Sequence, residues 1–241
     1  MQKKYYYFLP NTFTALNMGC GYLSIMYSYQ HQFTYACLIL VLGALFDSVD
    51  GRVARLTNTQ SSFGEQFDSL SDLISFGVAP SLLLYFYNFN QLGRLGIFIS
   101  FLYLLAGALR LARFNANIEK VDSAFFQGLP IPSGAVAIVG YVLFNEKYHL
   151  FDNYVYLVAL YALTYSFLMI SNIPFNSFKN SEFIHKKKKL MLLSLIIIIG
   201  LTFVYFKILV ITLINLYVLF SIIYYFKNKN KFGDIFLSEE K

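Results

Sequence analysis

The chain has 241 residues, of which 57% are hydrophobic and 19% aromatic, with a mean hydropathy of +0.55. Only 13% are charged, about half the ~25% of an average soluble domain, so one soluble core cannot hide the apolar excess. We therefore expect an integral membrane protein. The net charge of +6 suits contact with anionic headgroups, and no basic patch interleaved with exposed aromatics indicates a nucleic-acid partner.

Successive apolar runs predict an all-α fold, a polytopic membrane bundle of about eight transmembrane helices, each of roughly 20 residues. The expected spans are 11–29, 33–55, 67–88, 95–115, 131–147, 153–173, 190–206 and 208–226. The first six belong to a core of residues 1–180. Residues 181–241 add two spans and a basic tail. Because almost nothing separates the last two spans, we expect Lys207 at a tight turn at one membrane surface.

The basic residues predict how the bundle is oriented in the membrane. If the N-terminus is cytoplasmic, only three basic residues lie outside: Arg94, Lys147 and Lys207. The other sixteen lie inside: Lys3, Lys4, Arg52, Arg55, Arg110, Arg113, Lys120, Lys179, Lys186, Lys187, Lys188, Lys189, Lys227, Lys229, Lys231 and Lys241. This asymmetry predicts cytoplasmic termini in the cell inner membrane.

Four aspartates stand beside these apolar runs. Asp47 and Asp50 are three residues apart near the end of the second span, and Asp68 and Asp72 are four apart at the start of the third. On helices these spacings place each pair on one face. The two spans are antiparallel neighbours, so we expect all four carboxylates to meet at the cytoplasmic surface. Such a cluster requires a cation, and hard oxygen ligands suit Mg, Mn or Ca.

Small and basic residues accompany the aspartates at fixed intervals. Gly51 and Gly64 allow a ligand or a facing helix to approach closely, and Ala54 does so to a lesser extent. Arg55 can bind a phosphate group in bidentate geometry. Two metals a few ångströms apart can clamp a transferring phosphoryl group together with its leaving oxygen.

The whole arrangement matches the CDP-alcohol phosphatidyltransferase signature at every defined position, and the chain resembles that family. The matching residues are Asp47, Asp50, Gly51, Ala54, Arg55, Gly64, Asp68 and Asp72. The resemblance implies displacement of CMP from a CDP-linked lipid by an alcohol, with two divalent cations, a six-helix core and a homodimer. It also implies that the four aspartates bind the metals and that Asp72 deprotonates the attacking hydroxyl. The roles of Gly51, Ala54 and Gly64 would be to line the cytidine pocket.

Two further stretches resemble the phosphatidylserine synthase branch, the integral membrane type of this family. They read S-D-L-I-S-F-G-V-A-P at 71–80 and P-N-T-F-T-A-L-N at 10–17. This branch implies attack of the L-serine hydroxyl on the lipid-side phosphorus of CDP-diacylglycerol, giving phosphatidylserine and CMP. Glycerol 3-phosphate and an inositol phosphate are alternative acceptors. Those acceptors carry a phosphate dianion and call for more basic residues near the site.

Five residues are candidates for binding the acceptor alcohol or a phosphate group. Arg110 and Arg113 suit the serine carboxylate or the lipid phosphate, with anchoring to headgroups as the alternative. Asn11, Thr14 and Asn17 recur at helical spacing on the first span. They either line the site or bond to neighbouring helices, or the helix is capped here by Asn11 or Thr12.

Two readings compete with a catalytic metal centre. In the first, the aspartates pair with Arg52 and Arg55 as interfacial salt bridges, although two arginines cannot neutralise four carboxylates. In the second, the aspartates form the site of a divalent-cation transporter. Transporter sites usually lie near the bilayer midplane, whereas these residues lie near one surface, which favours the enzyme.

Overall fold

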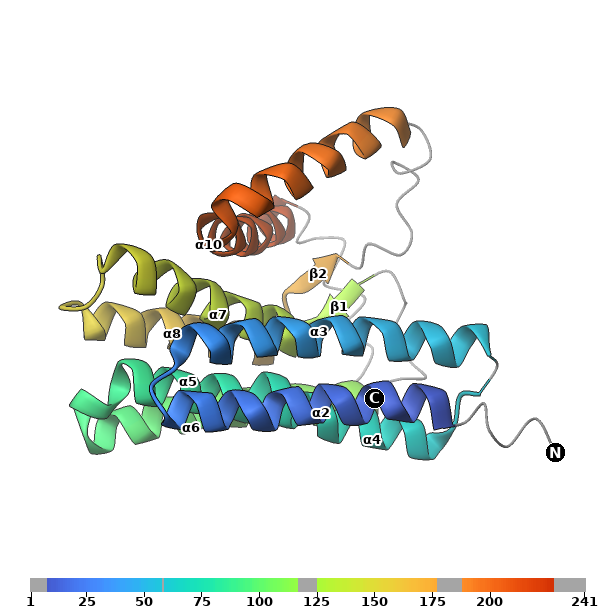
Figure 1. Ribbon diagram of the computed structural model, residues 1–241, viewed down its shortest axis with the longest axis horizontal. Helices are drawn as coiled ribbons and strands as arrows, with labels where there is room; N and C mark the ends of the chain where they lie inside the picture. The colour runs from blue at the N-terminus through green and yellow to red at the C-terminus, as the bar shows by residue number, and fades with distance from the viewer. Residues whose placement is uncertain (1–7, 58, 117–124, 177–187, 228–241) are drawn as a thin grey trace.

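A computed structural model describes residues 8–57, 59–116, 125–176 and 188–227, with the side chains of 8, 125, 176 and 188–206 left out (Figure 1). The fold is all-α, as predicted, and most of the chain lies in long helices. Their bounds are α2 (Phe8–Tyr29), α3 (Phe33–Leu56), α4 (Ser62–Asp72), α5 (Ala79–Tyr87), α6 (Arg94–Ala116), α7 (Ile131–Tyr148), α8 (Val155–Ile170) and α10 (Lys188–Lys227). A 3₁₀ turn, η2 (Phe89–Leu92), precedes α6.

The third predicted span is one rod of 26 residues made of three helical parts. It begins at α4, where the Ser61 hydroxyl caps the helix by accepting from the Gly64 N–H at 3.1 Å. A π-helical turn, η1 (Leu73–Val78), follows directly after Asp72, and α5 completes the rod. The rod runs beside α2 and α6 along the long axis of the molecule (Figure 1).

Four helical stretches of the described chain are long and apolar enough to cross a membrane: Phe33–Leu56, Ser62–Tyr87, Arg94–Ala116 and Lys207–Lys227. These helices indicate a membrane protein, but the described residues do not confirm the predicted count of about eight spans. Helix α8 has 16 residues, a length of about 24 Å against a hydrocarbon core of about 30 Å. Helix α2 carries Asn11, Thr14 and Asn17, which lower its hydropathy.

The structure has no break in the helix at Lys207, where a tight turn was predicted. Helix α10 is 40 residues long and continues through this residue, and its ribbon bends sharply part-way along its length (Figure 1). No proline or glycine occurs from Leu201 to Lys227, so every backbone N–H remains available to the helix. The expected boundary between residues 180 and 181, and the basic tail beyond Lys227, lie outside the described residues.

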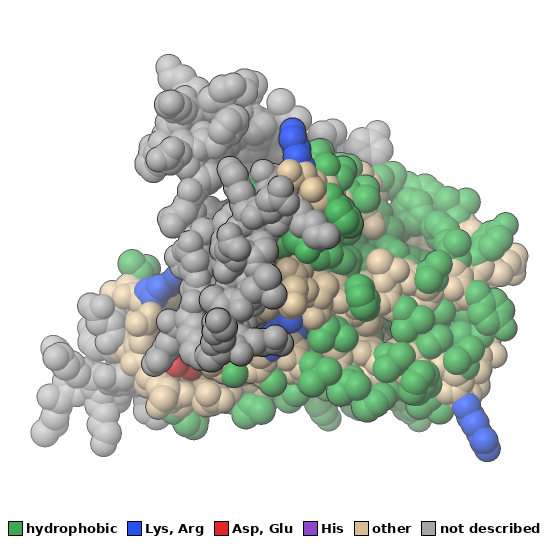
Figure 2. Space-filling model, turned by 180° about the vertical axis from the view of Figure 1, so that it is seen from behind, with side chains coloured by type: hydrophobic (Ala, Val, Ile, Leu, Met, Phe, Trp, Pro, Cys, Tyr) green, Lys and Arg blue, Asp and Glu red, His purple; other side chains and the backbone are tan. Residues whose placement is uncertain are grey.

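The core has little polar content and includes Leu83, Leu84, Tyr103, Ile138 and Val142. Hydrophobic side chains also cover most of the described surface seen in Figure 2, and the exposed residues include Leu38, Leu42 and Leu45 on α3. A soluble protein rarely exposes so large a contiguous apolar surface. This surface therefore suits contact with lipid chains.

A short two-stranded sheet is the one non-helical element in the described chain, and the sequence analysis did not predict it. Strand β1 (Phe125–Gln127) pairs in antiparallel fashion with β2 (Pro174–Asn176). Gly128 follows β1 with φ +75°, and a Cβ there would lie 2.4 Å from the Met169 carbonyl oxygen. Only glycine fits this close approach, which ties the start of α7 to the end of α8.

Candidate active site

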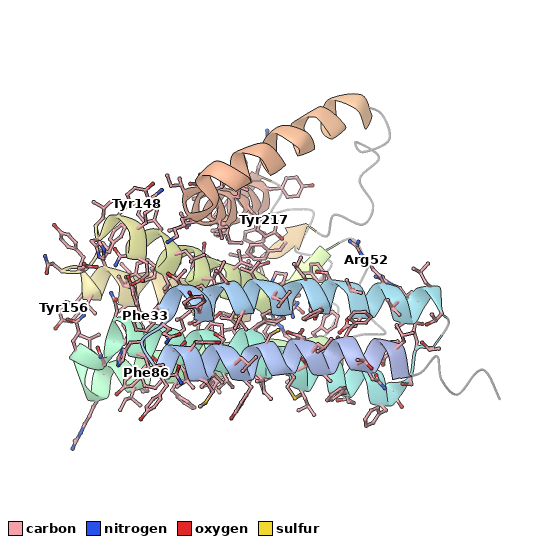
Figure 3. All side chains as sticks on the ribbon, viewed as in Figure 1. Phe33, Arg52, Phe86, Tyr148, Tyr156 and Tyr217 are labelled. Carbon is pink, nitrogen blue, oxygen red and sulfur yellow. The ribbon has the colours of Figure 1, made fainter. Side chains whose placement is uncertain are left out.

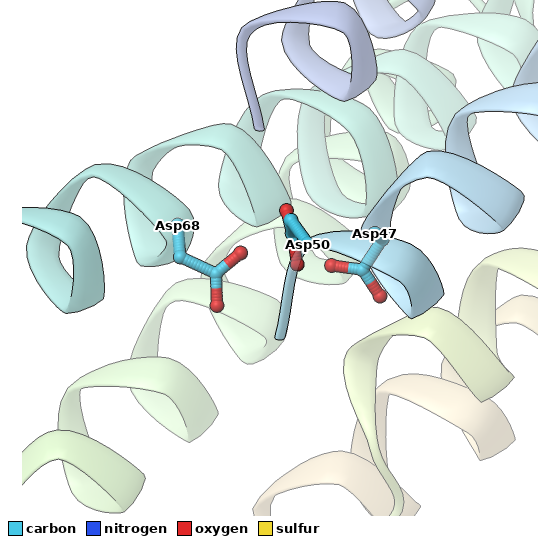
Figure 4. Close-up of side chains that lie close together, drawn as sticks. All are labelled: Asp47, Asp50 and Asp68. Atoms are coloured by element: carbon cyan, nitrogen blue, oxygen red, sulfur yellow. The ribbon is translucent and has the colours of Figure 1, made fainter. Parts of the chain in front are cut away.

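Three of the four aspartates meet between α3 and α4. Asp47 and Asp50 project from the last turns of α3, and Asp68 projects from α4, so that the carboxylates face one another (Figure 4). One oxygen from each lies within 4.8 Å of those of the other two. The three- and four-residue spacings place each pair on one helical face, and the short connection through residues 57–61 brings the two faces together.

Asp72 joins this group through Asp47. The carboxyl groups of Asp47 and Asp72 are close enough for their charges to interact. Asn17 Nδ2 on α2 also donates to Asp72 Oδ1 at 3.5 Å, at the outer limit of a hydrogen bond. Asp72 is the last residue of α4 before the π-helical turn. Such turns occur mostly as single insertions and frequently at functional sites.

The carboxylates have the surroundings of a cation site. Asp68 Oδ1 is buried and accepts no hydrogen bond, and none of the four aspartates forms an ion pair with a described Lys, Arg or His. Buried carboxylates without cationic partners are costly. Hard divalent cations prefer oxygen ligands of this kind. The cluster therefore fits a divalent cation.

The salt-bridge interpretation finds no support in the arginines of α3. Arg55 Nε donates to the Gly51 carbonyl oxygen of its own helix at 3.0 Å. Arg52 is exposed and points away from α2 and α4 (Figure 3). Neither guanidinium lies within 4.0 Å of a carboxylate oxygen of the cluster.

A cavity of about 440 Å³ opens beside the carboxylates. Asp50 and Asp68 lie on its wall, together with six other residues singled out from the sequence: Asn11, Thr14, Gly51, Ala54, Arg55 and Gly64. A Cβ on Gly51 would meet nothing within 4 Å, so this glycine leaves open space on the cavity side of α3. Asp47, Asp72, Asn17, Arg110 and Arg113 are not on the cavity wall.

The polar residues of α2 bond to neighbouring helices. Thr14 Oγ1 donates to Asp50 Oδ2 at 2.9 Å, and both residues are buried. Asn17 is fully buried and donates to Asp72. Neither Asn11 nor Thr12 caps α2, because both lie inside this helix, which includes residues from Phe8 onward. Helix α2 thus supplies hydrogen-bond donors to two of the four carboxylates.

The two arginines of α6 occupy different surroundings. Arg110 is 6% exposed, with its guanidinium 5.3 Å from the centre of the Phe114 ring and its Nε without a hydrogen-bond partner. It lies close enough to Asp72 for their charges to attract. Phe114, in turn, is on the cavity wall.

Arg113 instead binds the end of α8, the two residues that follow it and the last residue of β1. Its two terminal nitrogens donate at 3.0–3.3 Å to five oxygens. These are the Asn172 Oδ1 and the backbone carbonyl oxygens of Gln127, Met169, Ile170 and Ser171. The planar fork of arginine suits such a set of acceptors. These contacts give Arg113 a structural role that the sequence analysis did not predict.

Other residues of the site escaped the sequence analysis. Thr59, Gln60, Ser61, Glu65, Ser69 and Asn115 line the cavity, and Asn115 Nδ2 donates to Ser69 Oγ at 2.9 Å. Ser71 and Ser75 were noted only as letters of a motif. Their four-residue spacing on one helical face was the available signal.

The family model of the CDP-alcohol phosphatidyltransferases matches residues 7–175. The chain belongs to the CDP-alcohol phosphatidyltransferase family. The resemblance seen in the signature is thus confirmed, and the matched part of this phosphatidyltransferase includes α3, α4 and the cavity but ends before α10.

Curated proteins similar to this phosphatidyltransferase share one type of name. A Helicobacter pylori protein named CDP-diacylglycerol–serine O-phosphatidyltransferase is 47% identical over 174 residues, which are 72% of this chain and 73% of the relative. A Methanocaldococcus jannaschii protein of the same name is 38% identical over 173 residues, covering 71% and 75%. An archaetidylserine synthase of Methanothermobacter thermautotrophicus is 40% identical over 171 residues, covering 69% of each.

Proposed function

We propose that this phosphatidyltransferase transfers the phosphatidyl group of CDP-diacylglycerol to the hydroxyl of L-serine, giving phosphatidylserine and CMP. The observation that carries the proposal is the meeting of the carboxylates of Asp47, Asp50 and Asp68 within 4.8 Å, beside a cavity lined by Gly51 and Gly64. The names of the three relatives support serine as the acceptor.

In this proposal Asp47, Asp50, Asp68 and Asp72 hold two divalent cations, Mg or Mn. When bound, the cations screen the phosphate oxygens and the charge that develops on the departing CMP. The buried, unpartnered Oδ1 of Asp68 is the observation that best supports a bound ion.

The cavity beside the carboxylates would hold the cytidine nucleotide of the lipid substrate. Gly51, Ala54 and Gly64 present no large side chain to it, which leaves room for the ring and ribose. Arg55 would contact the diphosphate. Its Nε is engaged by the Gly51 carbonyl, so its terminal nitrogens remain for phosphate oxygens.

The reaction requires one proton transfer. The serine oxygen attacks the lipid-side phosphorus, the bond from this phosphorus to the bridging oxygen breaks, and CMP leaves with that oxygen. A serine hydroxyl is a weak nucleophile at neutral pH, so a positioned base must accept its proton. We assign this role to Asp72. The nearby Arg110 would attract the serine carboxylate or the lipid phosphate, with Asn11, Thr14 and Asn17 lining the acceptor side.

The same proposal places the site at the cytoplasmic surface of the cell inner membrane. Its support is the asymmetric distribution of basic residues, since Arg52, Arg55, Arg110 and Arg113 share the end of the bundle that carries the carboxylates. CDP-diacylglycerol would enter from the bilayer and serine from the cytosol. We further propose a homodimer, as the family resemblance implies.

The test is CMP release by the detergent-purified protein from CDP-diacylglycerol with Mg or Mn, offering serine, glycerol 3-phosphate or inositol phosphate. We expect release with serine alone. Release with another acceptor would contradict the serine assignment. Metal flux into proteoliposomes without CMP release would support a transporter instead.

A further inference from the structure

Two serines on successive turns of the rod formed by α4, η1 and α5 donate hydrogen bonds to the backbone of α2. Ser71 Oγ donates to the Thr14 carbonyl oxygen at 2.9 Å, and Ser75 Oγ donates to the Asn17 carbonyl oxygen at 2.8 Å. All four residues are buried, with both serines 0% exposed. The hydroxyls therefore face α2 and not solvent or lipid.

The two hydrogen bonds are one residue further apart along the rod than along α2. The serines are four residues apart and their acceptors three apart, so the sequence separation grows from 57 to 58. On two parallel α-helices this mismatch amounts to about 1.5 Å. The π-helical turn η1 begins at Leu73, between the serines, and its wider turn contains one more residue. The extra residue of the rod therefore falls where the helix is widened.

Gly21 allows this contact to be close. A Cβ at Gly21 would lie 2.6 Å from Ser75 Oγ and 2.8 Å from Ser75 Cα. Backbone atoms cannot yield as a flexible side-chain end can, so a side chain here would push α2 away from η1. The close approach fixes both the axial position of α2 along the rod and its rotation about its own axis.

The same two residues of α2 that accept from the serines donate to the carboxylates. Thr14 Oγ1 donates to Asp50 Oδ2 at 2.9 Å, and Asn17 Nδ2 donates to Asp72 Oδ1 at 3.5 Å. Each residue thus joins a serine through its backbone to an aspartate through its side chain. A shift of α2 along the rod would move both donors relative to their carboxylates.

We propose that Ser71 and Ser75 are positioning residues of the carboxylate site, acting through Thr14 and Asn17. They set the register of α2 and hence the arrangement of the aspartates that receive the cation. This inference rests on the proposed metal site. It does not depend on which alcohol is the acceptor, because it concerns metal binding before any substrate is present.

The experiment measures Mn²⁺ binding to the detergent-purified protein by electron paramagnetic resonance, without substrate. We expect Ser71→Ala and Ser75→Ala each to weaken Mn²⁺ binding about three- to tenfold, the effect of one lost hydrogen bond. The matched control is Ser81→Ala. Ser81 is buried in the same rod but donates to the Val78 carbonyl oxygen of its own rod, so its loss leaves Mn²⁺ binding unchanged.

Double variants separate positioning from a general loss of stability. Thr14→Val removes the donor to Asp50 and keeps the backbone acceptor of Ser71. If Ser71 acts through Thr14, then Ser71→Ala combined with Thr14→Val binds Mn²⁺ no more weakly than Thr14→Val alone. Losses that multiply would overturn the inference, as would equal weakening by Ser81→Ala. The same comparison of Ser75→Ala with Asn17→Leu provides a second test.

The metal assignment has its own distinct outcome in this experiment. Wild-type protein that binds no Mn²⁺ would overturn the metal site and the inference together. Mn²⁺ binding that is unaffected by either serine variant would overturn only the inference. CMP release with an acceptor other than serine would overturn the proposed acceptor and leave the inference standing.

Discussion

The Thr14 hydroxyl of α2 and the Asp50 carboxylate of α3 form a buried hydrogen bond of 2.9 Å. Hydrogen bonds to charged groups are worth about 1.5–3 kcal/mol, more than neutral ones. Helix α2 is therefore a third wall of the site, beside the two helices that carry the aspartates. A bond at this position orients Asp50 before any cation arrives.

Substitution of Asp72 by Asn should abolish CMP release while sparing the fold. The amide keeps the size of the side chain and its contact with Asn17, but it cannot take the proton from the hydroxyl of the attacking serine. Loss of a positioned base costs about 10²- to 10⁴-fold in rate. The measurement is turnover of the purified variant, with its melting temperature as a check on folding.

The control for this variant is Asp152→Asn. Asp152 pairs with His149 at 3.1 Å on the α7–α8 connection, at the other end of the bundle from the carboxylate cluster (Figure 1). Its loss should leave turnover unchanged. Full turnover by the Asp72→Asn protein would refute the assignment of the base.

Substitution of Gly51 by Ala should stabilise the fold and at the same time lower the enzymatic activity. Alanine in a helix interior is more favourable than glycine by about 1 kcal/mol, and the new Cβ meets no atom within 4 Å. The methyl group would, however, occupy the proposed nucleotide cavity. One extra carbon in a pocket is worth about 1–3 kcal/mol, so we expect kcat/KM for CDP-diacylglycerol to fall about tenfold.

Gly19→Ala provides the matched comparison. Gly19 is also helical and also has nothing within 4 Å of an ideal Cβ, but it is not on the cavity wall. It should raise the melting temperature as Gly51→Ala does and leave kcat/KM unchanged. Equal activity of the two variants would argue against nucleotide binding in the cavity.

The sequence was informative where function depends on spacing along single helices. Asp47, Asp50 and Asp68 could be predicted to meet, because helical periodicity places each pair on one face and a short loop joins the two helices. Contacts set by tertiary packing could not be predicted in this way. The bond from Ser71 to the Thr14 carbonyl depends on the register of two helices 57 residues apart in sequence.

Patterns along the sequence did not reveal the local structure at two positions. The near absence of residues between two expected spans suggested a tight turn at Lys207, but a helix continues wherever each N–H finds its carbonyl, and the backbone stays helical through this residue. Arg113 shared a helical face with Arg110 and suggested a second anion ligand. In the structure it faces the free carbonyls at the end of α8, which no periodicity of α6 indicates.

Substitution of Arg113 by Lys should destabilise the fold more than it affects chemistry. A lysine ammonium cannot reproduce the planar fork that serves five oxygens of α8 and its neighbours. We expect a loss of about 2–4 kcal/mol in the free energy of unfolding, measured by thermal or denaturant unfolding in detergent. Arg94→Lys, at the exposed start of α6, should cost almost nothing. A folded Arg113→Lys protein with normal stability and no turnover would restore Arg113 as a substrate ligand.

Addition of Mn²⁺ to metal-free protein should raise its melting temperature. The four aspartates form no ion pair with a described side chain, so an ion that binds only the folded state relieves their repulsion. At a free concentration of about one hundred times its Kd, one such ion adds about 2.7 kcal/mol to the free energy of unfolding. The Asp68→Asn protein should lose most of this rise in melting temperature, because the substitution removes a carboxylate whose Oδ1 is buried and unpartnered. Asp152→Asn should respond as the wild type does, and an equal Mn²⁺ effect in the Asp68→Asn protein would place the ion elsewhere.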